Sequence, residues 1–133
     1  MIKFHCQKSF NGFNLDVKFE IASGEFVALY GKSGSGKSTI LRLLAGFDKP
    51  NSGVISNGEQ IYYNKNIFLP PQKRNIGYLF QDYALFPNMT VMQNLLFANN
   101  DLKFATELLE FIELLEFKNA LPNTLSGGQK QRI

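Results

Sequence analysis

The chain has 133 residues, 44% of them hydrophobic, and a formal net charge of +3 at pH 7. This composition indicates a packed globular domain and excludes a disordered chain. Acidic and basic residues are interspersed without a block of one sign, so the charge does not indicate nucleic-acid binding. The single cysteine excludes an internal disulfide, and no apolar run approaches the ~20 residues of a membrane span. We therefore expect a cytoplasmic protein that reaches a membrane only through a partner.

The N-terminal part is predicted to be rich in β-strands. Residues 2–10 and 14–21 are two candidate strands, the second with alternating apolar and polar side chains. Asn11 and Gly12 between them are a turn signal, which predicts a hairpin. Residues 25–30 are almost all apolar, which is typical of a strand buried on both faces.

A glycine-rich loop follows, and beyond it the predicted elements change gradually from strands to helices. Residues 38–45 are predicted to form a helix with one apolar side, and Gly46 is placed to end it. The remaining predicted elements are strands at 54–55, 61–63 and 76–80 and helices at 90–97 and 103–117.

The glycine-rich loop, GKSGSGKS at residues 31–38, matches the Walker A pattern. Its glycines let backbone N–H groups surround phosphate oxygens, and the following helix directs its positive end at the same anion. Lys37 adds a cation for the β- and γ-phosphates, and the Ser38 hydroxyl can coordinate Mg²⁺. An ordinary glycine-serine turn would not explain the strand before the loop and the helix after it. The predicted nucleotide-binding residues here are Gly31, Lys32, Ser33, Gly34, Ser35, Gly36, Lys37, Ser38 and Thr39.

A second motif, LSGGQ at residues 125–129, is predicted to open a helix. Ser126 is a candidate N-cap, and the glycines leave backbone amides uncovered for an anion. Taken alone, the segment could be an ordinary helix N-terminus. Its occurrence after a Walker A loop favours a second phosphate-binding surface, made of Ser126, Gly127, Gly128 and Gln129.

Together these motifs resemble those of ABC ATPases. LSGGQ is similar to the family's signature motif, and GYLFQDYALFP at residues 77–87 resembles its Q-loop. The resemblance covers essentially the whole chain and is strongest to importer ATPases of the molybdate type, through LPPQKRNIG at residues 69–77. Sulfate, iron(III) and polyamine importers share similar segments.

The resemblance implies an α/β fold of the P-loop NTPase class, an ABC-type nucleotide-binding domain in truncated form. Residues 1–87 would form the antiparallel β subdomain and the P-loop core with the Q-loop, and residues 88–133 the helical subdomain. Gln81 would contact Mg²⁺ and the attacking water, so that Lys37 and Gln81 are the expected catalytic residues, and Ser38 and Gln81 the expected metal ligands. ATP and Mg²⁺ are the implied cofactors.

The implied function is that of an importer's ATP-binding subunit, which couples ATP hydrolysis to transport, with an oxyanion such as molybdate as the expected cargo. Two copies would assemble head to tail, with ATP between residues 31–38 of one and residues 126–129 of the other. Tyr83 and Phe86 would contact membrane-embedded permease subunits at the inner face of the cell membrane. Local packing of the helical part is the alternative explanation for these aromatics.

Three features of the N-terminal hairpin bear on this assignment. Phe10 and Phe13 are both candidates for stacking on adenine, with Phe10 preferred, although phenylalanines in a hairpin are equally often core residues. His5 is expected to be an ordinary strand residue. Cys6 is expected to be a small buried apolar residue.

The resemblance also implies what lies outside these residues. In the family, an Asp that holds Mg²⁺ and a Glu that polarises water follow the signature helix, and we expect the chain to be an N-terminal fragment that is inactive alone. Two alternatives remain, a soluble ABC ATPase without a transport role and a non-catalytic nucleotide-binding fragment. A P-loop GTPase or kinase is disfavoured because neither explains LSGGQ.

Overall fold

The computed structural model describes residues 1–10 and 12–133. They form two compact units, Met1–Tyr78 and Leu79–Ile133, which are described separately below. The division falls after Tyr78, whereas the sequence places the start of the helical subdomain after residue 87. Within the described part of the chain, no helix combines the length and the apolar character that crossing a membrane requires.

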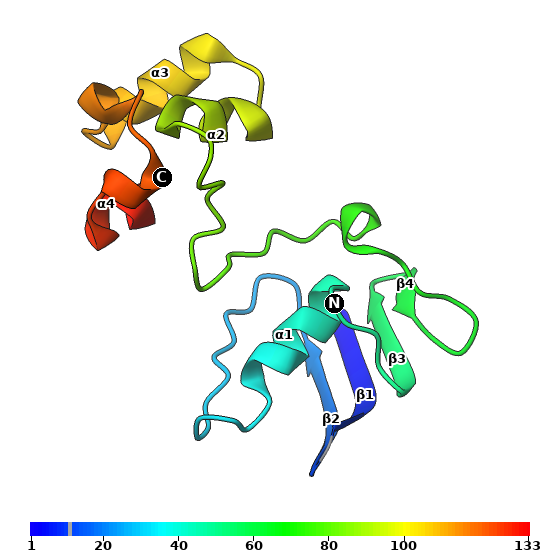
Figure 1. Cartoon of the computed structure of the whole chain (residues 1–133). Coiled ribbons are helices and arrows are strands. Elements are labelled where there is room, and N and C mark those ends of the chain that lie inside the picture. The colour runs from blue at the N-terminus through cyan, green and yellow to red at the C-terminus, as the bar shows by residue number, and fades with distance from the viewer. Residues whose placement is uncertain (11) are drawn as a thin grey trace. The chain divides into compact units, whose positions relative to one another are not determined.

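The first unit contains one antiparallel sheet (Figure 1). Strands β1 (Ile2–Phe10) and β2 (Phe13–Ile21) pair along their full length, which confirms both strands of the predicted hairpin. Asn11 of the predicted turn lies outside the described residues, and Gly12 has a φ of 85°. Strands β3 (Ser52–Asn57) and β4 (Gln60–Tyr63) complete the order β2-β1-β3-β4. They confirm the predicted short strands and extend them.

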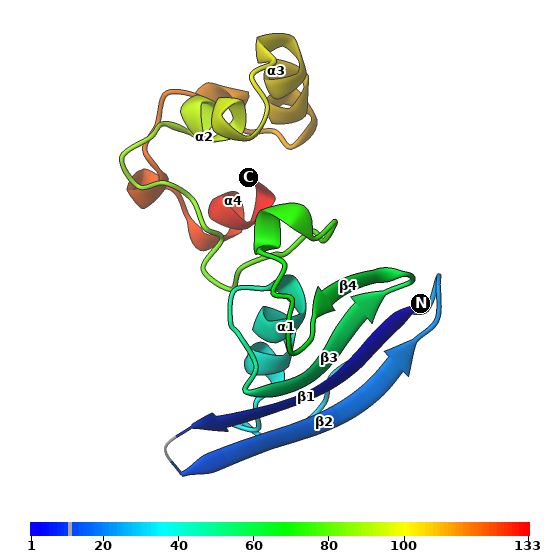
Figure 2. The ribbon, with the colours of Figure 1, turned by 90° about the vertical axis from the view of Figure 1, so that its right-hand side faces the viewer.

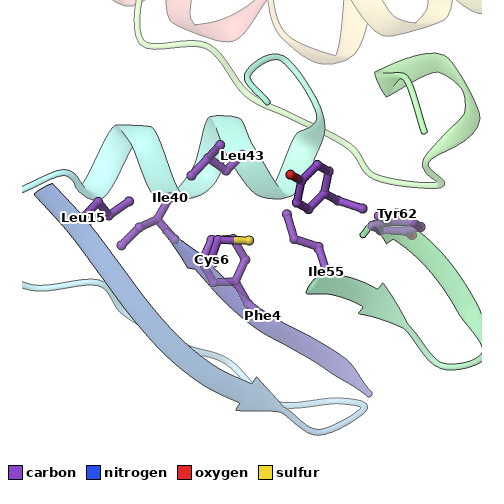
Figure 3. Packing of buried hydrophobic residues seen from close by; sticks show 8 residues of the cluster. Phe4, Cys6, Leu15, Ile40, Leu43, Ile55 and Tyr62 are labelled. Atoms are coloured by element: carbon purple, nitrogen blue, oxygen red, sulfur yellow. The ribbon is translucent and has the colours of Figure 1, made fainter. Parts of the chain in front are cut away.

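Helix α1 (Lys37–Ala45) covers one face of this sheet (Figure 2), and the core lies between them (Figure 3). Gly46 ends the helix in the left-handed conformation, as predicted. Cys6 is fully buried, which confirms its expected role, and His5 is exposed on the opposite face of β1. The buried residues of the core are Phe4, Cys6, Leu15, Ile40, Leu43, Ile55, Tyr62 and Tyr63.

Two predicted strands are wrong. Residues 25–30 and 76–80 make neither strand nor helix hydrogen bonds, and the rings of Phe26 and Tyr30 are fully exposed. A β-strand is stable only when its backbone groups pair with a neighbour. The described strands pair with one another in the antiparallel sheet, and none of them pairs with either segment. Apolar composition alone therefore did not produce a strand.

The second unit is helical and has its own core. Helix α2 (Val91–Ala98) begins after Thr90, whose side chain forms a capping box with Gln93, and α3 (Leu102–Phe111) begins after the N-cap Asp101. Helix α4 (Gly127–Arg132) is the last. Short 3₁₀ helices η2 (Leu115–Phe117) and η3 (Pro122–Thr124) lie between α3 and α4, and η1 (Pro71–Lys73) belongs to the first unit. The buried apolar residues of this core are Val91, Leu109, Leu114 and Leu125.

The helix predicted at 103–117 is too long. It ends at Phe111, and Glu113 adopts a φ of 59° in the left-handed region. The chain then folds back so that the Leu114 amide donates to the Leu109 carbonyl at 2.8 Å. This reversal buries Leu114 completely. Burial of one leucine side chain is worth about 2 kcal/mol, enough to outweigh the weak preference of the sequence for continuing the helix.

Candidate functional site

The loop at residues 31–38 closes around the side chain of Lys37. The Lys37 ammonium donates to the carbonyl oxygens of Gly31 and Lys32, both at 2.8 Å. The Ser35 amide donates to the Lys32 carbonyl at 3.2 Å, which makes a turn inside the loop. The two ends of the loop are therefore joined through the Lys37 ammonium, and most residues of the loop are exposed.

Glycine is required at two points of this loop. Gly34 and Gly36 have φ values of 79° and 89°, a region that other residues rarely adopt. A Cβ atom at Gly36 would also lie 2.9 Å from Cδ1 of Leu15, so β2 packs directly beneath the loop. The backbone can approach a ligand closely there because no side chain intervenes.

The N-terminus of α1 is open to an anion. Gly36 is its N-cap and makes no side-chain capping bond, and no acidic residue lies in the first turn. The first N–H groups of a helix lack partners within the helix and carry partial positive charge. The Ser38 side chain is exposed in this turn and that of Thr39 is half-buried. Cationic Lys37 and the helix N-terminus thus lie at the same loop.

The two aromatic candidates lie side by side next to the loop. The nearest ring atom of Phe13 would be 3.3 Å from a Cβ atom at Gly36. The ring of Phe10 follows, with its centroid 6.4 Å from that of Phe13 and 5.7 Å from the Lys8 ammonium. Phe10 is 43% and Phe13 38% exposed, so neither is a core residue. The ring that packs against the loop is therefore that of Phe13, whereas the sequence analysis preferred Phe10.

The segment at 125–129 forms a capped helix start. The Ser126 side chain accepts from the Gln129 amide at 3.2 Å, and the Gln129 side chain accepts from the Ser126 amide at 2.8 Å. This capping box confirms the predicted N-cap. Leu125 is buried in the core of the second unit, whereas Ser126, Gly127 and Gly128 are exposed. The motif is thus anchored by its leucine and presents its glycine backbone to solvent.

Gln81 is exposed at the start of an unusually bent segment. Two successive residues, Tyr83 and Ala84, have φ values of 61° and 53°. Such conformations cost of order 1 kcal/mol each outside glycine and persist only where the surroundings impose them. The bend leaves Tyr83 and Phe86 about two-fifths exposed, at 41% and 40%. Both residues are therefore accessible, and the Phe86 ring also packs against that of Phe97 in α2, with centroids 4.7 Å apart, as the alternative of local packing expects.

Asn94, which the sequence analysis missed, holds the end of this bend. Its amide oxygen accepts from the Phe86 amide at 2.8 Å, and its amide nitrogen donates to the carbonyls of Phe86, Met89 and Thr90. The residue is 8% exposed. An asparagine among the mostly apolar residues of the predicted helix at 90–97 was the available signal, because a buried amide needs partners.

The comparisons with known proteins agree with these motifs. Residues 15–133 match the family described as ABC transporter. The spermidine/putrescine import ATP-binding protein PotA of Nitrosospira multiformis is 43% identical, over 89% of this chain and 34% of PotA. The sulfate/thiosulfate import ATP-binding protein CysA of Thermosynechococcus vestitus is 44% identical, over 97% of this chain and 40% of CysA. The molybdenum import ATP-binding protein ModC of Photobacterium profundum is 36% identical, over 90% and 35%.

Solved structures show the same fold. The dimeric structure of the bacterial ABC transporter cassette MJ0796 matches with a TM-score of 0.75 and 33% identity, over 99% of this chain and 66% of that chain. A dimeric post-hydrolysis state of the same cassette, bound to ADP and Pi, matches with a TM-score of 0.67 and 31% identity. The fold class is that of the ABC-type P-loop NTPase, as predicted.

This chain therefore belongs to the ABC transporter family. The three relatives are named as ATP-binding proteins for import of spermidine and putrescine, of sulfate or thiosulfate, and of molybdenum. The chain spans between a third and two-fifths of the length of these curated relatives.

Proposed function

We propose that this chain binds ATP as part of the ATP-binding subunit of an ABC importer. The observation that carries the proposal is the loop at residues 31–38, which places the Lys37 ammonium and the open N-terminus of α1 together. A phosphate there would be met by a cation and by backbone N–H groups, which is the combination that phosphate oxygens favour. The relatives named as import ATP-binding proteins support this assignment.

Mg²⁺ would enter with the nucleotide. The exposed Ser38 hydroxyl in the first turn of α1 fits one oxygen ligand of Mg²⁺, which usually combines few protein ligands with phosphate oxygens and water. Gln81 is proposed as a second contact, through its amide oxygen. When bound, the ion would neutralise charge that develops on the phosphates during transfer. Lys37 would hold the β- and γ-phosphates, and Gln81 would orient the attacking water.

The base is proposed to stack beside the loop. Phe13 lies against Gly36, which makes it the better candidate on geometry, and Phe10 extends the same aromatic surface. An aromatic face stacks on adenine without a hydrogen-bond pattern of its own. Both rings are partly exposed and therefore accessible to a base.

The signature segment is proposed to serve the nucleotide of a second copy. Its exposed residues Ser126, Gly127 and Gly128 do not belong to the loop at 31–38, and a second phosphate-facing surface is useful only at an interface. The solved structure of the similar cassette MJ0796 is dimeric, which supports a pair of copies, and we propose that the pair is head to tail. Tyr83 and Phe86, both accessible, are proposed to contact the permease subunits at the inner face of the membrane.

The cargo is proposed to be an inorganic oxyanion such as molybdate. Two of the three relatives described above are named for oxyanion or molybdenum import, and the third for polyamines. Our proposal assigns selection of the cargo to no residue of this chain, because the site at residues 31–38 and its neighbouring aromatic rings would recognise the phosphates and the base of the nucleotide.

Amide NMR shifts test the nucleotide site. Mg²⁺-ATP should shift the amides of residues 31–39 and the ring signals of Phe13 saturably, while β1 residues on the far face of the sheet, such as His5, stay unchanged. EDTA should weaken the effect, because Ser38 then loses the ion that links it to the phosphates. Saturable shifts elsewhere with none at residues 31–39 would contradict the site.

A further inference from the structure

Arg74 is a buried cation without an acidic partner. It is only 2% exposed, and no ion pair to it is found among the described residues. Its guanidinium donates to four backbone carbonyls instead, those of Leu43, Leu44, Tyr62 and Leu69, at 2.7–3.3 Å. Burial lowers the pKa of this guanidinium below its ordinary value. A buried charge persists only where its hydrogen bonds are satisfied, so this position is built for arginine.

The surroundings of Arg74 match its shape. The guanidinium carbon lies 5.3 Å from the ring centroid of Tyr62 and 5.4 Å from that of Phe68, in cation–π geometry. A Cβ atom at Gly46 would lie 2.7 Å from Nε of Arg74. Only glycine therefore leaves room for the side chain at the end of α1.

Two elements of the proposed site meet at this residue. The carbonyls of Leu43 and Leu44 belong to the last turn of α1, where the partial negative charge of the helix favours a cation. The same nine-residue helix, about 13 Å long, begins at Lys37 of the phosphate loop. Arg74 itself begins the segment that leads through Tyr78 toward Gln81.

A second contact joins the same two elements. The ring of Tyr78 packs edge-on against Phe47, which follows α1, with centroids 5.0 Å apart. The segment at 74–78 has no strand or helix hydrogen bonds of its own, and it is held by the contacts of Arg74 and Tyr78 with the end of α1 and by the packing of Ile76 against the core of the first unit.

We propose that Arg74 is a positioning residue, which fixes the end of the phosphate-loop helix and the start of the segment leading to Gln81 to one another. It touches no nucleotide. Its side chain hydrogen-bonds the last turn of α1 while its backbone begins the segment at 74–78, so a shift of α1 on nucleotide binding is transmitted to that segment. This inference rests on the proposed nucleotide site for its functional meaning, whereas the mechanical connection does not depend on it.

Amide hydrogen exchange on the chain tests the connection without nucleotide. Arg74→Gln removes the cation, and Arg74→Lys keeps it but loses the planar fork. Both should speed exchange in two segments, residues 40–48 and 74–78, by roughly 5- to 100-fold for Gln and by less for Lys. Lys49→Gln is the matched control, because Lys49 carries the same charge just beyond the same helix end but is exposed. It should leave residues 74–78 unchanged.

Faster exchange in residues 40–48 alone would make Arg74 a simple helix cap and would overturn the proposal, as would no change in either segment. If Arg74→Gln unfolds the sheet, exchange will also rise throughout β1 and β2. Arg74→Lys is then the deciding variant. Faster exchange in both residues 40–48 and residues 74–78 supports the proposal, and any other pattern overturns it.

A second arm adds Mg²⁺-ATP. In the wild type, exchange should slow both at residues 31–40 and at residues 74–78. In Arg74→Lys, protection should remain at 31–40 and disappear at 74–78. Protection confined to 31–40 in the wild type would overturn the coupling and leave the proposed function intact. Protection nowhere would overturn the nucleotide site, and the nucleotide-free arm would still decide the role of Arg74.

Discussion

The Lys37 ammonium lies 2.8 Å from the carbonyl oxygen of Gly31, at the far end of the same loop. One side chain therefore closes the loop and supplies its charge. Lys37→Ala should lower ATP affinity at least 10-fold and, in a full-length cassette that carries this sequence, abolish hydrolysis, because the loop loses the cation aimed at the phosphates. Equilibrium titration with a fluorescent ATP analogue and a phosphate-release assay measure the two effects.

Lys103→Ala is the charge-matched control for this change. Lys103 is exposed in α3 and makes only a long contact, 3.9 Å, with Glu107. The Lys103→Ala variant should bind nucleotide as tightly as the wild type does. Turnover like that of the wild type in Lys37→Ala would contradict the assignment of the loop.

Ser126→Arg should separate nucleotide binding from dimerisation. Ser126 is exposed and caps α4, and we propose that it serves the nucleotide of a second copy. A full-length cassette with the change should bind ATP nearly normally but fail to dimerise with ATP, as measured by light scattering. Thr90→Arg removes the equivalent capping box of α2 and should leave dimerisation intact. An equal loss of ATP binding by the Ser126 variant monomer would count against the shared site.

Asn94 should be important for the stability of the helical unit. Asn94→Ala leaves the Phe86 amide and three carbonyls without their side-chain partner, at a cost of about 2–3 kcal/mol. Asn94→Asp should cost at least as much, because a carboxylate oxygen would then face those carbonyls. Urea unfolding, read by exchange in α2 and α3, measures the change. Asn88→Ala, at an exposed residue of the same loop, should have little effect. Equal stability of the Asn94 and Asn88 variants would refute this role.

Cys6 should make the first unit sensitive to alkaline pH. Burial raises the pKa of its thiol from 9.0 to about 12, so the unfolded chain releases this proton first as the pH rises. The free energy of unfolding should therefore fall above pH 9, by about 1.4 kcal/mol per pH unit, until the folded thiol ionises near 12. Cys6→Ala should lack this component. Urea unfolding under reducing conditions at pH 8, 9 and 10 measures the difference, and parallel curves for the two proteins would exclude it.

Local sequence signals predicted the parts of the fold that local physics determines. The alternation of apolar and polar side chains predicted the strands of the β1–β2 hairpin. The N-cap at Ser126 could be predicted because it depends only on hydrogen bonds between neighbouring residues. Residues 25–30 and 76–80 were misassigned because a strand depends on a partner that composition does not reveal. The early end of α3 likewise depends on the burial of Leu114 elsewhere in its unit.

The residues of the candidate site likewise fall into those that the sequence predicts and those that it does not. The loop at 31–38 is readable from the sequence because its chemistry depends on residue type and spacing. Arg74 is not, since nothing in a proline-rich connection indicates that a charged side chain will be buried on carbonyls from α1 and β4. The choice between Phe10 and Phe13 needed the position of Gly36 against β2.

The 133-residue chain alone should show no Mg²⁺-dependent ATPase activity above background. Phosphoryl transfer needs charge stabilisation and an oriented water, and the loop at residues 31–38 offers a cation and hydroxyl groups but no carboxylate. The Glu25 carboxylate already accepts a hydrogen bond from the Ala22 amide at 2.6 Å, and Asp82 is exposed beside Gln81. Phosphate release from the purified chain should equal that of Lys37→Ala. A turnover that requires both Mg²⁺ and Lys37 would show that these residues already contain a complete hydrolytic site.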